Sequence, residues 1–294
     1  MNLIKPRKWW YIISLIIITP GIISLILFGL KPSIDFTGGT LIEIEGTKDR
    51  AKIEALAKNN HFENLVVAET DGGYSLRSKP ITEESHKKFK EGLVSVSGAK
   101  EVRVETVGPS VSREITNRAF ISIALASFLI VVYLAYAFRK VPKPAKSLEF
   151  GITAVIALLH DTLVLLGVFS LLGHFFGIEV DPLFITAVLT VIGFSVHDTI
   201  IIYDRIRENL IKGEPGTFEW VVNKSIIERL PRTFSTSVLV WIMLLVLYIF
   251  GGETIKFFVL ALVIGIFSGT YSSIFNASPL LVTWQNFKQK RSHR

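Results

Sequence analysis

Long, uninterrupted runs of apolar residues dominate this chain of 294 residues. A bilayer core about 30 Å thick needs about 20 helical residues to cross it, and six of the runs reach or nearly reach that length. The predicted spans are Tyr11–Leu30, Ala119–Phe138, Phe150–Leu172, Pro182–Tyr203, Phe234–Phe250 and Phe257–Val282. The pattern therefore predicts a polytopic α-helical membrane protein with six transmembrane helices.

The stretch between the first two spans has short segments with a different period. Leu41–Glu45 alternates apolar and acidic residues, as a half-buried strand does, and a helical pattern follows it. A hairpin with its turn at Asp71–Gly73 and a helix capped by Thr82 come next. The last strand is expected to carry Val102 and Val104 on one face. The order β-α-β-β-α-β predicts a small ferredoxin-like α+β domain between helices 1 and 2.

Basic residues indicate how the chain crosses the membrane. The N-terminus, segments 139–149 and 204–233, and the tail hold 17 of the 32 lysines and arginines, and the two short loops on the other side hold one. The positive-inside rule therefore predicts cytoplasmic termini and an extracytoplasmic α+β domain. This topology also explains the pI near 9.5, so no nucleic-acid partner is expected.

The predicted organisation has four parts. These are residues 1–30 with the first transmembrane helix, 31–118 as the extracytoplasmic domain, 119–283 with helices two to six, and 284–294 as a basic cytoplasmic tail.

Two carboxylates stand inside predicted spans. Asp198 and Asp161 each follow a histidine, His197 and His160. An aspartate at the centre of a membrane helix costs about 2.5–3.5 kcal/mol on translocon scales, so such a residue is functional by default. Neighbouring residues on a helix point about 100° apart, which hinders joint metal ligation. We expect no metal site and no cofactor.

Turn-forming residues flank the predicted domain. Asp35 precedes the paired glycines Gly38 and Gly39 on one side, and Gly108 and Pro109 form a Gly-Pro step on the other. Paired glycines and Gly-Pro steps are typical of turns and hinges. These stretches are interpreted either as hinges or as simple connectors.

The sixth span contains a stripe of small residues. Gly265, Gly269, Ser273 and Ala277 recur every four residues, a pattern that lets helix backbones approach closely. The stripe predicts helix packing, either within this chain or against a partner.

Enzyme motifs are incomplete or absent in the sequence. The stretch Gly193–His197 lacks the final glycine of a G-x-S-x-G nucleophile elbow, and no P-loop occurs. Neither membrane aspartate follows the Gly-x-Gly approach that an intramembrane aspartyl protease would use. We therefore expect a protein that is not an enzyme.

Five separated motifs resemble those of the SecF family. They are IDFTGG at 34–39, VETVGP at 104–109, GFSVHDTIIIYDRIREN at 193–209, RTFSTS at 232–237, and SGTYSSIF with PLL within 268–281. Members of this family are the smaller subunits of the SecDF protein-export motor, which is related to the resistance–nodulation–division transporters.

The resemblance implies a task and partners. With SecD, the chain would use the proton-motive force to promote preprotein translocation across the cytoplasmic (inner) membrane. Its partners would be SecD, the Sec protein-conducting channel with its accessory subunits, the translocating preprotein and membrane lipid. The alternative function is a proton-coupled exporter of small molecules or lipids of the resistance–nodulation–division type.

The resemblance also implies roles for membrane residues. Asp198 would gain and lose the proton, and Arg232 would be its cationic partner; the alternative is a static bridge between them. Burial disfavours the charged form of a carboxyl group and a nearby guanidinium favours it, which together suit reversible protonation. His197 stands where the family usually has asparagine, so the hydrogen bonding of Asp198 is expected to differ. Asp161 would either share protons with Asp198 or accept hydrogen bonds from hydroxyls of a neighbouring span.

Overall fold

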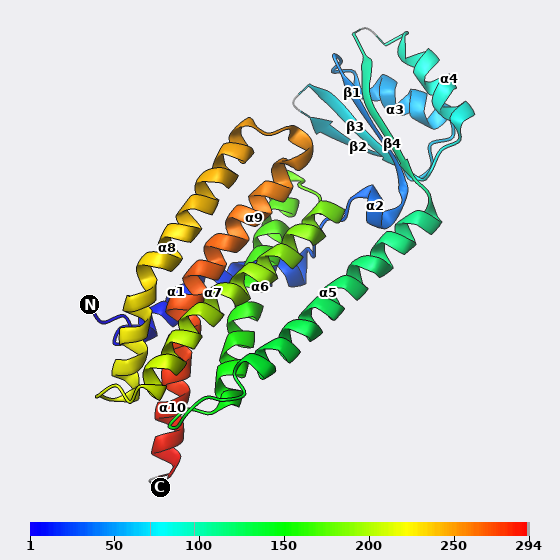
Figure 1. Cartoon of the computed structure of the whole chain (residues 1–294). Helices are drawn as coiled ribbons and strands as arrows, with labels where there is room; N and C mark the ends of the chain where they lie inside the picture. The colour runs from blue at the N-terminus through cyan, green and yellow to red at the C-terminus, as the bar shows by residue number, and fades with distance from the viewer. Residues whose placement is uncertain (71, 97, 293–294) are drawn as a thin grey trace. The chain divides into compact units, whose positions relative to one another are not determined.

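A computed structural model describes residues 1–70, 72–96 and 98–292 (Figure 1). The chain divides into two compact units. The helical unit comprises Met1–Lys31 and Ser122–Arg294, and the α+β unit comprises Pro32–Ile121.

Six helical segments are long and apolar enough to cross a membrane, within the described ranges. They are α1 (Arg7–Leu27), α5 (Pro109–Ala137), α6 (Ser147–Phe176), α7 (Pro182–Ile211), α8 (Phe218–Phe250), and α9 (Glu253–Ser272) continued by η1 (Ser273–Ala277) and α10 (Ser278–Ser292). The prediction of six spans is confirmed.

Several helices extend beyond their apolar runs because polar residues continue the helix outside the predicted span. Helix α8 begins at Phe218, and its N-cap is Thr217, whose side-chain oxygen accepts a hydrogen bond from the Trp220 amide at 3.2 Å. Such a cap stabilises the start of the helix. The polar residues that follow this cap lie outside the predicted span. The sixth span differs from a uniform α-helix, since a π-helical turn interrupts it at Ser273–Ala277.

The centre of the helical unit is built from α6, α7 and α9, and α7 and α9 share the most extensive helix–helix contact. Helix α1 packs against α6, where Gly21 and Gly167 face each other so closely that a Cβ on Gly21 would lie 2.8 Å from the Gly167 Cα. Beside this contact the Ser24 and Ser170 hydroxyls are 2.7 Å apart. Small residues therefore bring the first span against the bundle.

A buried carboxylate on α6 is hydrogen-bonded to side chains of α10. Glu149 is 4% exposed and accepts hydrogen bonds from the Lys146 amide at 2.9 Å and the Lys288 ammonium at 2.8 Å. The Gln285 side-chain amide also donates to it. Since Gln285 and Lys288 belong to α10, these contacts hold the C-terminal helix beside the start of α6.

The α+β unit has the predicted element order. Its elements are α2 (Ile34–Thr37), β1 (Gly39–Glu45), α3 (Arg50–Asn59), β2 (Val66–Thr70), β3 (Gly73–Ser78), α4 (Glu83–Leu93) and β4 (Lys100–Val107). The sheet order is β2-β3-β1-β4 with every neighbouring pair antiparallel. Figure 1 shows α3 and α4 on the same face of this sheet. The ferredoxin-like prediction is confirmed.

The core of this unit lies between the sheet and the two longer helices. Ile42 and Ile44 of β1 are fully buried against Ile53 of α3 and Phe89 of α4. Thr82 caps α4 as predicted, because its hydroxyl accepts from the Ser85 amide at 3.2 Å. Strands β2 and β3 form the predicted hairpin, in which Thr70 lies opposite Gly73. The predicted turn includes Asp71, which lies outside the described residues.

One strand prediction is wrong. The pairing of β1 with β4 shifts register between Glu43, opposite Arg103, and Ile44, opposite Glu101, which leaves Val102 as the extra residue of a β-bulge. Val104 packs against the core, whereas Val102 is 54% exposed. Simple alternation fails here because a bulge shifts one strand against its partner by one residue.

Replacing Phe89 by alanine should unfold the α+β unit preferentially. Loss of a fully buried phenylalanine costs about 3–5 kcal/mol, whereas Val94→Ala removes apolar atoms from a side chain that is 86% exposed and should change stability little. Pulse proteolysis of the full chain in detergent, with fragments assigned by mass, measures both variants. Equal protease resistance of the two would contradict the core described here.

Candidate functional site

Two buried carboxylates and a set of serine and threonine hydroxyls lie where α6, α7, α8 and α9 meet. Asp161 belongs to α6 and Asp198 to α7, and both are almost completely inaccessible. The hydroxyls that contact them come mainly from α9, which packs against all three other helices. We call this set the polar seam; it comprises Asp161, Asp198, Ser195, Ser237, Ser268, Thr270 and Ser272.

Asp161 receives four hydrogen bonds. Ser195 of α7 and Ser272 of α9 donate to Oδ2, each at 2.6 Å. Ser268 of α9 donates to Oδ1 at 2.7 Å, and His160 Nδ1 lies 2.9 Å from the same oxygen. Both oxygens of this carboxylate are therefore held by two contacts each, from three helices.

Asp198 has a sparser environment. Thr270 of α9 donates to its Oδ2 at 3.2 Å, and the Thr270 hydroxyl lies 2.9 Å from the Ser237 hydroxyl of α8. The three side chains form a short chain from α7 through α9 to α8. Among the residues that the structure describes, Asp198 thus has one hydrogen-bond partner, whereas Asp161 has four.

This difference separates what the two acids can do. Protonating Asp161 would put a donor on an oxygen that already has two contacts, and would disturb the contacts of that oxygen. Asp198 can accept a proton on the oxygen that Thr270 does not contact, with its existing hydrogen bond kept. The geometry suits Asp161 to holding helices together and Asp198 to a change of charge.

A second layer of contacts lies next to the seam along α7. The hydroxyls of Thr199 and Ser273 are 2.8 Å apart, which joins α7 to η1. The buried phenol of Tyr203 donates to the Ala277 carbonyl at 2.9 Å and lies 2.6 Å from the Thr153 hydroxyl of α6. These contacts fix the register of α6, α7 and η1.

The predicted cationic partner does not contact the acid. The Arg232 side chain is exposed, and within the described part of the chain it forms no salt bridge with Asp198. The static bridge considered as an alternative is therefore absent from this conformation. His197 is also exposed, so it lies on the surface of α7 while Asp198 points into the seam.

The small-residue stripe lies at the contact of α9 with α7. A Cβ on Gly265 would come within 2.1 Å of Val191 Cγ2, and one on Gly269 within 3.2 Å of Ser195 Cα. Ser273 and Ala277 continue the line into the π-helical turn, where both are buried. The close approach at Gly269 brings the serines of α9 and Ser195 within reach of one carboxylate.

The two turn motifs meet at one end of the α+β unit. Gly39 at the start of β1 pairs with Val107 at the end of β4, directly before Gly108 and Pro109. Gly38 and Gly39 have φ values of 70° and 134°, a region that side chains disfavour, and a Cβ on Gly39 would lie 2.5 Å from the Ser78 carbonyl oxygen. Asp35 accepts a hydrogen bond from the Ser33 hydroxyl at 3.0 Å within the short α2 turn.

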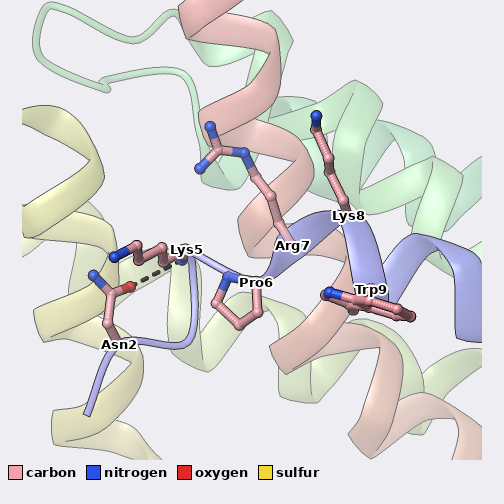
Figure 2. A pocket seen from close by; sticks show the side chains of 6 residues that line it. All are labelled: Asn2, Lys5, Pro6, Arg7, Lys8 and Trp9. Carbon is pink, nitrogen blue, oxygen red and sulfur yellow. Dashed lines mark hydrogen bonds between the residues drawn. The ribbon is translucent and has the colours of Figure 1, made fainter.

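The hollow at the N-terminus is separate from the polar seam. Figure 2 shows the side chains that line it, among them Lys5, Arg7, Lys8 and Trp9. Arg7 pairs with Glu219 of α8 at 3.1 Å, and Trp9 is 66% exposed. Basic and aromatic residues of this kind are typical of a membrane interface.

Sequence reasoning named the two acids but missed most of the donors around Asp161. Ser195 and Ser268 appeared only as members of motifs, and Ser237 was likewise unassigned. The spacing of Ser268 and Ser272, one helical turn apart, was the available signal, because it places two hydroxyls on one face. No group of three or more potential metal ligands occurs among the described residues.

Two models of protein families match this chain. The model "Protein export membrane protein SecD/SecF, C-terminal" matches residues 88–287, and the model "SecD/SecF GG Motif" matches residues 23–49, which include Gly38 and Gly39. The chain belongs to the SecD/SecF family. The resemblance inferred from its motifs is thus confirmed.

Relatives within the SecD/SecF family match almost the whole chain. Protein translocase subunit SecF of Thermobaculum terrenum is 50% identical, covering 97% of this chain and 94% of that protein. The SecF of Anaerolinea thermophila is 37% identical with the same two coverages of 97% and 94%.

Solved SecDF structures share the fold. The crystal structure of SecDF, a translocon-associated membrane protein, from Thermus thermophilus has a TM-score of 0.80 and 29% identity, covering 97% of this chain and 39% of that one. SecDF in its super-membrane-facing form has a TM-score of 0.68 and 28% identity, covering 100% and 40%. The chain therefore spans about two fifths of the SecDF chains it matches.

Substituting Gly265 tests the close contact of α7 and α9. Gly265→Ala should destabilise the helical unit by about 1–3 kcal/mol, because the new methyl group overlaps Val191. Gly151→Ala is the matched control, since a Cβ there meets no atom within 4 Å. Thermal unfolding of the full chain in detergent measures both.

Val191→Ala should recover part of the loss in the Gly265→Ala background. Equal stability of the Gly265→Ala and Gly151→Ala variants would contradict the packing.

Proposed function

We propose that this chain is a subunit of the Sec protein-export machinery that works with SecD and uses the proton-motive force to promote preprotein translocation across the cytoplasmic membrane. The near full-length match to protein translocase subunits SecF supports this role. SecDF chains are more than twice as long as the region matched here, which supports a SecD partner. Further partners in the proposal are the Sec protein-conducting channel, the preprotein and membrane lipid.

The relatives do not favour the exporter alternative. The two SecF proteins match this chain over nearly their whole lengths, and the exporter reading rested only on the wider superfamily.

The proposed orientation puts both termini in the cytoplasm. The Leu3 amide donates to Asn223 of α8 at 2.7 Å, and Lys288 pairs with Glu149 at 2.8 Å. These contacts join the N-terminus to segment 204–233 and the C-terminal helix to segment 139–149, which supports a common side for all four. Because lysine and arginine favour the cytoplasmic side, that end of the helical unit faces the cytoplasm.

Asp198 is the proposed proton-binding group. A unit charge moved through the full membrane potential gains about 2.3 kcal/mol per 100 mV, enough to bias a two-state structure. Protonation of Asp198 converts an acceptor into a group that can also donate, and its partner Thr270 is hydrogen-bonded to Ser237. A change at Asp198 therefore acts on the contact between α7, α9 and α8.

The other candidate residues take supporting roles in the proposal. Arg232 on α8 approaches Asp198 in a second conformation, when the contact between α7 and α8 has changed. His197 precedes Asp198 in sequence and lies on the exposed face of α7. Its proposed role is to assist proton transfer to Asp198. Asp161 anchors the seam, as its four contacts indicate.

The α+β unit is the proposed moving part outside the membrane. Its chain enters through Gly38 and Gly39 and leaves through Gly108 and Pro109. These two stretches lie side by side at the paired ends of β1 and β4. A hinge at this position would turn the unit as one body, because its core is closed by its own helices.

Replacing Asp198 by asparagine should abolish stimulation of preprotein export by the proton-motive force. The carboxamide keeps the shape and the hydrogen bond from Thr270 but cannot titrate. Asp204→Asn is the matched control on the same helix, because Asp204 is half exposed and paired with Arg207 at 2.8 Å. Export of a model preprotein into inverted vesicles, with and without an uncoupler, measures the effect.

The variant must also be tested for its complex. SecD should co-purify with Asp198→Asn as it does with the unchanged chain, and export should fall to the level of vesicles lacking the subunit. A full response to the gradient in Asp198→Asn vesicles would contradict the proposal.

A further inference from the structure

A cavity that opens onto the surface of the helical unit is lined in part by His160. Its volume is about 230 Å³, and α1, α6, η1 and α10 contribute to its lining. Most of the wall is apolar, with Leu15 and Ile156 among its residues, whereas Ser14, His160 and Asn276 are polar. All of these residues belong to the segments predicted to cross the membrane.

Two buried polar atoms at this cavity have no protein partner. Within the described residues, His160 Nε2 and Asn276 Nδ2 make no hydrogen bond, although each residue is only 9% exposed. Their other polar atoms are engaged, since His160 Nδ1 lies 2.9 Å from Asp161 Oδ1 and the Ser14 hydroxyl donates to Asn276 Oδ1 at 2.9 Å. Buried polar groups are normally satisfied by protein or by ordered water, so the orphaned pair points to a ligand.

The hydrogen bonds of His160 Nδ1 and Asn276 Oδ1 indicate whether the two unpartnered nitrogen atoms donate or accept. The Asp161 carboxylate only accepts hydrogen bonds, so His160 Nδ1 carries the hydrogen and a neutral ring leaves Nε2 as an acceptor. The Ser14 contact makes the Asn276 oxygen the acceptor of its amide, which leaves Nδ2 as a donor. The missing ligand must therefore donate to one nitrogen and accept from the other. A single hydroxyl group or water molecule meets both demands.

We propose that this cavity is a water site in which a water molecule connects His160 Nε2 and Asn276 Nδ2. A water molecule occupies about 30 Å³ in the liquid, so the cavity has room for it and for neighbours. Purely apolar cavities stay dry, but this one offers the polar partners that a buried water requires. The water site does not depend on the proposed role in export.

The bridging water fixes the hydrogen bonds of the His160 ring. Nδ1 donates to Asp161 Oδ1, and Nε2 accepts from the water. The titratable groups facing His160 are Asp161 on α6, Tyr11 of α1 and Tyr271 of α9, whose ring centroid is 6.4 Å from that of His160. Tyr11 and Tyr271 are already hydrogen-bonded, to Thr283 and to the Trp10 carbonyl.

X-ray hydroxyl-radical footprinting of the full chain in lipid nanodiscs tests the site, because radiolysis of bound water labels the side chains beside it. His160 should be oxidised. Tyr203 is the internal control: it is also buried, its hydroxyl is hydrogen-bonded, and it does not line the cavity. If His160 is labelled no faster than Tyr203, the cavity is dry or holds an acyl chain, and the proposal is overturned.

A variant separates the water from general loosening of the helices. Asn276→Leu removes the donor and should abolish labelling of His160, whereas Asn223→Leu, which removes an amide near the N-terminus, should leave it unchanged. Labelling of His160 that persists in a folded Asn276→Leu protein would contradict the bridging water. The comparison of His160 with Tyr203 in the unchanged chain decides the question even if this variant does not fold.

The tautomer is tested by ¹⁵N spectroscopy of histidine-labelled protein, with His160→Gln to assign the signal. The expected neutral ring carries its hydrogen on Nδ1. A hydrogen on Nε2 would overturn the proposed bridge, in which Nε2 accepts from the water.

Discussion

The helical unit depends on satisfying a carboxylate in a place that water does not freely reach. Asp161 is fully buried, and a buried charge is tolerated only when donors surround it. Three serines and one histidine, on α6, α7 and α9, supply those donors. The helices must therefore lie close together and in one register. The buried charge of Asp161 thus requires α9 to pack closely against α6 and α7.

Small residues make that approach possible. Gly265 and Gly269 let the backbone of α9 reach the side chains of Val191 and Ser195, and the π-helical turn that follows shifts the line of buried residues on the sixth span. Single-turn π segments are rare and occur frequently at functional sites. Here the turn presents Asn276 to the cavity beside His160 and joins Ser273 to Thr199. The same helix thus serves the seam on one side and the cavity on the other.

The fold was largely predictable, because the length of an apolar run and the alternation of residues in a strand are both local properties of the sequence. Apolar length located all six spans, and alternation with turn chemistry gave the order of the α+β unit. The β-bulge at Val102 and the π-helical turn were not predictable, since each is an insertion whose register depends on a partner strand or helix. Local sequence carries no such information.

The candidate site was predictable only in part. Charge in a hydrocarbon segment singled out Asp161 and Asp198, but the hydroxyls around them are common residues whose facing directions depend on three-dimensional packing. Of the two roles predicted for Asp161, its hydrogen bonds to serines of α7 and α9 support the one in which it accepts from hydroxyls of neighbouring spans. Whether Arg232 faces Asp198 was not predictable, because the sequence shows the order of the spans but not which faces they turn toward each other.

The central claim is that Asp198 changes its protonation while Asp161 keeps its network. Difference infrared spectroscopy of the protein in sealed vesicles, recorded with and without an imposed proton gradient, measures this most directly. The account predicts a carbonyl band of a protonated carboxyl group that responds to the gradient, vanishes in Asp198→Asn and persists in Asp161→Asn. A band that does not respond to the gradient, or one that vanishes only in Asp161→Asn, would contradict the account.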